Sequence, residues 1–347
     1  MSARAIILAL AACAAIGIAF EAGRIDGLGE RPAPPAALHP KAPAAPKAAV
    51  PAATATHAEL PEVDTGPDIT SIASYEDLMY AQPDLVDAQV KALHPQTPGK
   101  VDLYVLGFAG DAQQNAFRNE VEYLPRLLAG RFAAEGHTVQ LVNSQQTFER
   151  TPLAMRSNLY DALAGIGDTM DRNEDILLLF LTSHGSRDHE LLVDMGSLPL
   201  DQLTPRDIRD ALDKARITWR VIVVSACFSG GFIPELQEPH TLIITAARSD
   251  RTSFGCGADS KITWFGEAFL TQALNRTSDF HEAFVLAGKT IAFWEHRDGQ
   301  TPSEPQFWEG PLIAPKLAAW RATLPAAALT VPFAPAMTAS AAHRAAR

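Results

Sequence analysis

The sequence predicts an α/β fold built on a mostly parallel sheet. Two apolar runs, residues 176–181 and 221–224, are continuous rather than alternating, which is typical of strands buried on both faces of a parallel sheet. Segments with helical periodicity stand between the apolar runs. This alternation of strand and helix is the pattern of a parallel sheet with right-handed crossovers.

Each element is predicted by its own local pattern. Apolar residues three and four positions apart predict the helices, and Pro125 is expected to kink the first long one. Thr204, followed by Pro205 and Asp207, is a well-formed helix start. The expected elements are an entry helix over 74–95, strand 101–110, helix 116–134, strand 137–143, a helix around 159–170, strand 176–182, a small hairpin over 190–200, helix 204–216, strand 221–225, strand 241–247, helices 263–275 and 280–294, and a last strand over 305–310.

Composition divides the 347 residues into a folding unit and two unusual ends. Residues 71–314 are long enough for one large domain with a full core, and residues 315–347 are an Ala/Pro-rich tail expected to be disordered. The formal charge of -11 and the lack of a basic stripe argue against general nucleic-acid binding, because phosphates require clustered Lys and Arg.

The N-terminal segment has the pattern of a targeting element. Residues 5–20 carry no charge after Arg4, which predicts a signal peptide or membrane anchor over 1–20. Cys13 ends a stretch that resembles the lipobox of bacterial lipoproteins and is a lipidation candidate. Lipoprotein, uncleaved anchor and cleaved signal all place the domain outside the cytoplasm. Residues 21–70 form a Pro/Ala-rich linker, so we expect an extracytoplasmic, periplasmic domain tethered to the inner membrane.

Two reactive side chains follow the two apolar runs. His184 comes directly after the first run and Cys227 after the second, so both are expected at the edge formed by the carboxyl ends of the strands. A Cys and a His at one edge make a nucleophile and its proton carrier. A disulfide between Cys227 and Cys256 is not expected, because a domain of this size does not need one. A buried, inert cysteine is the alternative for Cys227. A metal site at His184 and His189 lacks a remote ligand, so no metal or cofactor is expected.

The motifs around these two residues resemble a known family. TSHGS at 182–186 and SACFSGG at 225–231, with Cys227 43 positions after His184, resemble the legumain family of asparaginyl endopeptidases within the caspase-fold cysteine peptidases. The resemblance implies a caspase-like three-layer α/β/α sandwich and a cysteine endopeptidase that cleaves peptides or proteins after Asn or Asp through an acyl-enzyme. It also implies an oxyanion hole formed by the backbone N–H groups of Gly185 and Cys227.

The resemblance extends over residues 101–310 and implies roles for further side chains. Residues 246–256 and 264–270 are similar to family segments that line the specificity pocket. Because a guanidinium donates hydrogen bonds and a carboxylate accepts them, an arginine and a glutamate could together bind a carboxamide. The implied substrate-binding residues are Arg118, Ser225, Thr252, Ser253 and Glu267, and Asn115 is the residue that could steady the histidine.

Two positions depart from the family pattern. Ser225 and Ser183 stand where family members commonly carry acidic residues, two positions before the cysteine and one before the histidine. Two alternatives to hydrolysis therefore stay open. One is a peptide ligase or transamidase on the same fold, and the other is a catalytically inactive, protein-binding scaffold.

Overall fold

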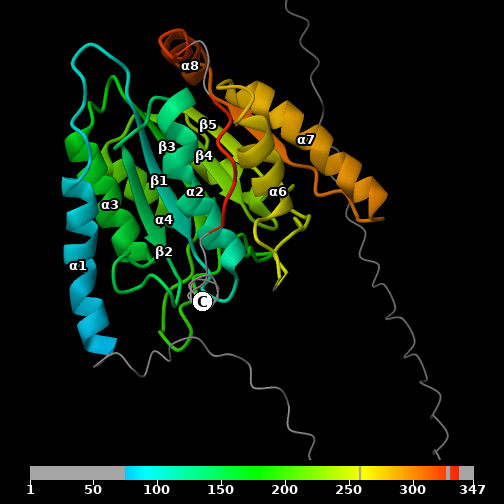
Figure 1. Cartoon of the computed structure of the whole chain (residues 1–347), viewed down its shortest axis with the longest axis horizontal. Coiled ribbons are helices and arrows are strands. Elements are labelled where there is room, and N and C mark those ends of the chain that lie inside the picture. Colours follow the sequence, from blue (N-terminus) through cyan, green and yellow to red (C-terminus); the bar gives the residue numbers. More distant parts are fainter. Residues whose placement is uncertain (1–74, 258, 326–328, 336–347) are drawn as a thin grey trace, which may run out of the picture. The chain divides into compact units, whose positions relative to one another are not determined.

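The computed structural model describes residues 75–257, 259–325 and 329–335 of the chain (Figure 1). The predictions made for residues 1–20, for the linker over 21–70 and for Cys13 lie outside these residues, and so does the predicted membrane contact. Within the described part, no helix is both long and apolar enough to cross a bilayer. The extracytoplasmic location therefore stays a prediction from the sequence.

A single six-stranded sheet forms the centre of the domain. Its strand order is β2-β1-β3-β4-β5-β6, with every neighbouring pair parallel except β5 and β6, which are antiparallel. The mostly parallel α/β sheet predicted from the sequence is confirmed. The strands span Leu103–Ala109 (β1), Thr138–Val142 (β2), Ile176–Thr182 (β3), Trp219–Ser225 (β4), Thr241–Thr245 (β5) and Gln306–Glu309 (β6).

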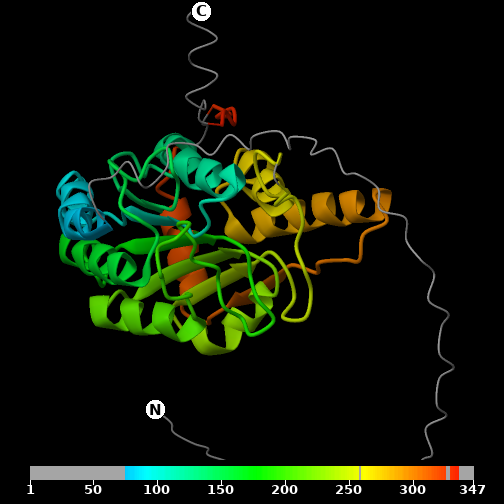
Figure 2. The same cartoon turned by 90° about the horizontal axis from the view of Figure 1, so that it is seen from below.

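Helices cover both faces of this sheet. Side chains alternate along each strand, so that Leu178 and Phe180 of β3 belong to one hydrophobic core and Leu177 and Leu179 to the other. Figure 2 shows the resulting three layers, with α2 and α7 on one side of the sheet and α3 and α4 on the other. The helices span Tyr75–Lys91 (α1), Asn115–Arg131 (α2), Arg156–Thr169 (α3), Pro205–Ala215 (α4), Ile233–Leu236 (α5), Trp264–Gly266 (α6), Phe280–Arg297 (α7) and Ile313–Arg321 (α8), with a 3-10 turn at Ser229–Phe232 (η2) and a π-helical stretch at Glu267–Ala273 (η3).

Local sequence explains where several helices begin. Thr204 accepts a hydrogen bond from the backbone N–H of Asp207, whose carboxylate in turn accepts one from the backbone N–H of Thr204. This reciprocal pair is the predicted capping box of α4, and it satisfies two backbone donors that a helix start otherwise leaves unpaired. Asp279 caps the start of α7, because its carboxylate accepts hydrogen bonds from the backbone N–H groups of His281 and Glu282.

Two features differ from the sequence expectations. Residues 190–200 do not form a hairpin. Leu191 instead makes isolated antiparallel bridges to Gly185 and Leu203, because the loop folds back against the end of β3. The folded part also extends beyond residue 314. Trp320 of α8 is buried, since three large apolar side chains recur along one side of an otherwise Ala-rich segment that composition alone marks as a tail.

The carboxyl ends of the parallel strands collect the loops that carry the predicted site. The loops after β3 and β5 lie along the lower edge of the domain in Figure 1. Thr182 is the last residue of β3 and Ser225 is the last residue of β4, and the two lie opposite each other in the β3–β4 register. Continuing that register by two residues brings position 184 opposite position 227.

Candidate active site

Cys227 leaves β4 as a half-buried free thiol. The next residue, Phe228, adopts a left-handed backbone conformation with φ of 57°, so the chain turns sharply away from the strand and leaves the cysteine at its tip. The backbone N–H of Ser253 lies 3.3 Å from Sγ and donates to it. The sulfur also lies 3.6 Å from the backbone oxygen of Ser253, so the backbone of Ser253 holds the thiol on two sides.

His184 is held on the neighbouring strand end by contacts on two sides. Its ring meets the ring of Phe117 edge-on, with centroids 5.2 Å apart. Its Nε2 lies 3.6 Å from Oδ2 of Asp111, which is an ion-pair distance rather than a hydrogen bond. The histidine ring is therefore positioned by α2 and by the loop that follows β1.

Gly185 brings the two strand ends into direct contact. A Cβ atom at this position would lie 2.0 Å from the backbone oxygen of Cys227 and 3.0 Å from its carbonyl carbon. Because backbone cannot yield as a flexible side chain can, only glycine lets the histidine strand lie this close to the nucleophile.

Gly185→Ala is expected to destabilise the domain by about 1–3 kcal/mol, the usual cost of forcing an extra methyl group into a filled space. Chemical denaturation with a midpoint shift at constant m-value measures the effect. Gly288→Ala is the matched control, because a Cβ there meets no atom within 4 Å. Equal stability of Gly185→Ala and wild type would contradict the close contact.

Asp111 is the residue at the site that motif comparison missed. It follows β1, is 1% exposed, and accepts a hydrogen bond from the backbone N–H of Gln113. Burial raises the pKa of the Asp111 carboxyl, while the Gln113 N–H and nearby His184 act in the opposite direction. Asn115, the expected partner of the histidine, is exposed at the first residue of α2. The carboxylate beside His184 is thus that of Asp111.

The comparisons with known proteins bear on this geometry. The model of the peptidase C13 family, the legumain family, matches residues 165–311. The match includes both strand-end motifs and supports a cysteine peptidase of the legumain and caspase type, which acts on peptides or proteins.

The chain was also compared with curated proteins and with solved structures. A search of curated proteins finds no significant match to this chain. Among solved structures, caspase-1 from Spodoptera frugiperda is similar, with a TM-score of 0.42 and 12% sequence identity over 62% of this chain and 90% of that one.

Arg118 lies in α2, outside the C13 match, and its side chain is 3% exposed. Its guanidinium donates to the hydroxyl of Ser144 at 3.3 Å and to the carboxamide oxygen of Gln146. The Nε atom is buried without a hydrogen-bond partner, although Glu122 lies 3.9 Å away. Burial lowers the pKa of Arg118. The guanidinium already binds one carboxamide, and that carboxamide belongs to an exposed side chain.

The other predicted substrate-binding residues have different local surroundings. Ser253 is beside Cys227 and Thr252 is exposed next to it, whereas Ser225 is buried below and lies 3.3 Å from the hydroxyl of Thr263. Glu267 begins η3, with Gln272 as its hydrogen-bond partner at 3.4 Å. Within the described residues no hydrogen bond or ion pair joins Arg118 to Glu267. Two residues that share a substrate carboxamide need no direct bond, so their joint role stays a prediction.

Cys256 offers no second nucleophile of comparable setting. It is a free, half-buried thiol packed against the hydrophobic core beneath η3 and α7. Burial raises the pKa of the Cys256 thiol, and the neighbouring Cys227 adds to that rise. A raised pKa keeps the Cys256 sulfur protonated and unreactive, which leaves Cys227 as the candidate nucleophile among the described residues.

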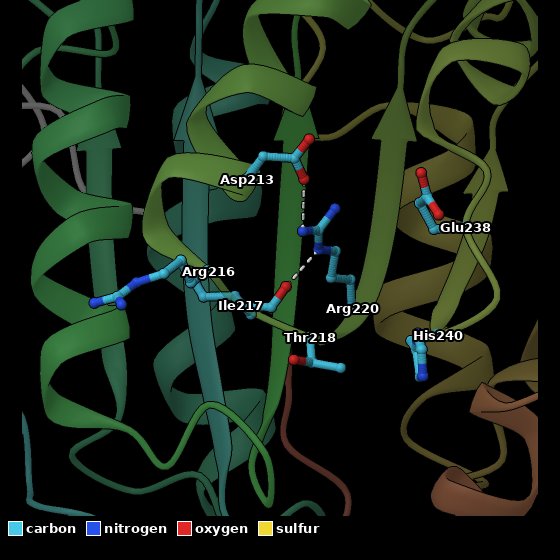
Figure 3. Close-up of a pocket in the computed structure, with 7 residues that line it drawn as sticks. All are labelled: Asp213, Arg216, Ile217, Thr218, Arg220, Glu238 and His240. Atoms are coloured by element: carbon cyan, nitrogen blue, oxygen red, sulfur yellow. Dashed lines mark hydrogen bonds and ion pairs between the residues drawn. The ribbon is translucent and has the colours of Figure 1, made fainter.

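The strand-end site coincides neither with a metal-binding cluster nor with the pocket shown in Figure 3. Over residues 75–257, 259–325 and 329–335, no group of three or more His, Cys, Asp or Glu side chains could hold a metal ion. Figure 3 shows a pocket of about 470 Å³ lined by Arg220, Glu238 and His240 among others. It lies where β4 and β5 begin, at the opposite edge of the sheet from Cys227.

Proposed function

We propose that the chain is a cysteine endopeptidase of the legumain type that uses Cys227 as nucleophile and His184 as proton carrier. The observation that carries this proposal is the meeting of the two strand ends, where Gly185 packs against the backbone of Cys227. The C13 match supports the reaction class.

In the proposed reaction the Cys227 thiolate attacks the scissile carbonyl carbon and forms a tetrahedral intermediate. Collapse of this intermediate breaks the C–N bond, and His184 donates a proton to the departing amine. Water then attacks the resulting thioester, which releases the new carboxylate and regenerates the thiol. With Nε2 beside Asp111, Nδ1 of His184 is the nitrogen that exchanges protons.

The backbone N–H groups of Gly185 and Cys227 would bind the oxyanion. Neither donates a backbone hydrogen bond within the described part of the chain. The flanking bonds, from Ser186 to Glu190 and from Leu192 to His184, hold the Gly185 peptide in place. Preorganised free donors of this kind stabilise the charge that develops in acyl transfer.

Arg118 supports a preference for Asn at P1, the residue before the cut, with Asp as the second choice. A substrate carboxamide could replace that of Gln146, because Gln146 is exposed and the buried guanidinium keeps its donors in a fixed fork. Glu267 would accept from the N–H groups of the same carboxamide, which is a separate part of the proposal.

A peptide series that varies only P1 tests the proposal. Wild-type protein is expected to cleave the Asn peptide best, and Arg118→Met to reduce kcat/KM for it by about 10- to 100-fold, because hydrogen bonds to charged groups contribute about 1.5–3 kcal/mol. Arg126→Met is the control, since Arg126 lies on the same helix but binds the backbone oxygen of Ala334.

Four results would contradict parts of this proposal. Equal cleavage at all P1 residues, or an unchanged Asn preference in Arg118→Met, would remove the specificity assignment. Products whose masses show ligation to an added amine instead of hydrolysis would favour the ligase. A Cys227 thiol that no alkylating reagent labels would favour the non-catalytic scaffold.

A further inference from the structure

A second layer of polar side chains lies directly beneath His184 and Cys227. Thr182 and Ser225 are opposite each other in the β3–β4 register. Since side chains alternate between faces, Thr182 and His184 point toward the same face of the sheet, as do Ser225 and Cys227. Both Thr182 and Ser225 are buried. The hydroxyl side chains of Thr182 and Ser225 therefore lie beneath His184 and Cys227 on the same face of the sheet.

Glu120 of α2 connects the members of this layer. Its Oε2 accepts a hydrogen bond of 2.6 Å from the hydroxyl of Thr182, and its Oε1 accepts one of 2.9 Å from the backbone N–H of Thr263. The hydroxyl of Thr263 lies 3.3 Å from that of Ser225. One carboxylate thus joins the end of β3 directly, and the end of β4 through Thr263.

The backbone around Thr263 is shaped to accommodate this carboxylate. Thr263 caps the start of α6, because its hydroxyl accepts a hydrogen bond from the backbone N–H of Gly266. A Cβ at Gly266 would lie 2.1 Å from Oε1 of Glu120. Glycine is needed there because the helix backbone passes directly over the carboxylate.

The Glu120 carboxylate costs the fold free energy that a neutral residue would not. The side chain is 0% exposed, and no ion pair with Lys or Arg reaches it within the described residues. Burial raises the pKa of Glu120 to about 7, even though the hydrogen bonds from Thr182 and Thr263 lower it. Burying a carboxylate without a cation destabilises the fold, whereas buried acids with shifted pKa values are common at functional sites.

We propose that Glu120 is a positioning residue of the peptidase, whose two hydrogen bonds set the separation of the strand ends that carry His184 and Cys227. The inference rests on the proposed function, since it assigns a second layer to the same site. Beyond Thr182 and Ser225 the ladder continues only through a 3.3 Å bond from the Ser183 N–H to the Ser225 oxygen. Backbone bonds tie each tip to its own neighbouring loop, as from Leu192 to His184, so the Glu120 contacts add a link between the two strand ends.

The spacing matters because attack and proton transfer require close approach. A misplacement of about 1 Å in a catalytic constellation can reduce the rate by about 100-fold. Removing Glu120 leaves Thr182 and the Thr263 N–H without their acceptor, and either strand end can then shift. The expected loss appears in kcat, since Glu120 touches no substrate.

Two substitutions separate the hydrogen bonds from simple stability. Glu120→Ala is expected to lower kcat by about 10- to 100-fold with KM within about twofold of wild type. Glu120→Gln is expected to retain kcat within about threefold, because its Oε1 can accept from Thr263 and its Nε2 can donate to Thr182. The rate of Cys227 alkylation by iodoacetamide, followed by peptide mass mapping, is expected to be highest in wild type, slightly lower in Glu120→Gln and lowest in Glu120→Ala. This measurement needs no substrate.

Glu295→Ala is the matched control for loss of a buried carboxylate. Glu295 of α7 is 2% exposed and accepts a 2.8 Å bond from the Ser303 N–H. This control should lower the melting temperature but keep kcat per folded molecule. If Glu120→Ala does not fold, Thr182→Val removes one of the bonds at constant volume and should lower kcat in the same direction.

The outcomes are distinct. Full kcat in folded Glu120→Ala, or equal kcat losses in Glu120→Ala and Glu295→Ala, would overturn the inference. Failure of Glu120→Gln to restore kcat and the alkylation rate would also overturn it, since hydrogen-bond geometry would then not be the cause. A wild-type protein without peptide cleavage or Cys227 alkylation would instead overturn the proposed function.

Discussion

Replacing Cys227 by alanine is expected to abolish peptide cleavage, with kcat/KM falling on the order of 10⁴-fold or more. Without sulfur no acyl-enzyme can form, and only the weak effects of binding and oxyanion stabilisation are left. The substitution removes one atom from a half-buried tip, so the fold should persist. Initial rates on the preferred peptide, together with labelling by a thiol-directed probe, measure the loss.

Cys256→Ala is the matched control, because Cys256 is the other free thiol in the described part of the chain. It should retain both activity and probe labelling, since burial keeps that thiol protonated. Cleavage that survives in Cys227→Ala, or that disappears in Cys256→Ala while the protein stays folded, would exclude Cys227 as the nucleophile.

The sheet was predictable because burial on both faces leaves a direct trace in sequence. In β3 and β4 every position from 176 to 182 and from 220 to 225 is buried, and the residues at 176–181 and 221–224 are all apolar. The loop at 190–200 was not predictable in the same way. Its apolar residues pack against the end of β3 instead of pairing with each other, and that choice depends on tertiary contacts.

The strand-end rule that indicated His184 and Cys227 also applies to Asp111. It is the second residue after β1, at the same edge, and a carboxylate there is a candidate by the same reasoning. The motif comparison drew attention to Asn115 instead. A rule based on topology would have found the residue that stands beside the histidine in this chain.

Glu120 gives no comparable signal. It lies in α2 among polar residues, and a helix of this kind normally turns its charged side chains toward water. It is buried because the segment around Thr263 closes over it, a contact between residues 143 positions apart. Sequence patterns specify the sheet and its reactive tips, whereas the surroundings of those tips follow from how α2 and α6 dock.

Asp111→Asn is expected to lower kcat by about 10- to 100-fold, and His184→Ala by about 10²- to 10⁴-fold, the usual range for a general acid or base. The Asp111 carboxylate lies 3.6 Å from His184 Nε2, where its charge stabilises the imidazolium that protonates the leaving amine. Losing an interaction of about 1.5–3 kcal/mol with a charged group corresponds to the kcat loss expected for Asp111→Asn. Single-turnover rates on the Asn peptide measure both.

The pH dependence distinguishes a catalytic role of Asp111 from a structural one. Burial raises the pKa of this carboxyl above its unfolded value, so the folded protein binds the proton more tightly. Ionised Asp111 therefore costs stability above that pKa, and the cost disappears as the pH falls. Asp111→Asn should thus keep or increase the melting temperature at pH 8 while kcat falls. In wild type, the share of activity that depends on the carboxylate should be lost as the pH drops through the raised pKa, and the Asn variant should lack this decline. A variant that loses stability and activity together at pH 8 would show instead that Asp111 serves the fold.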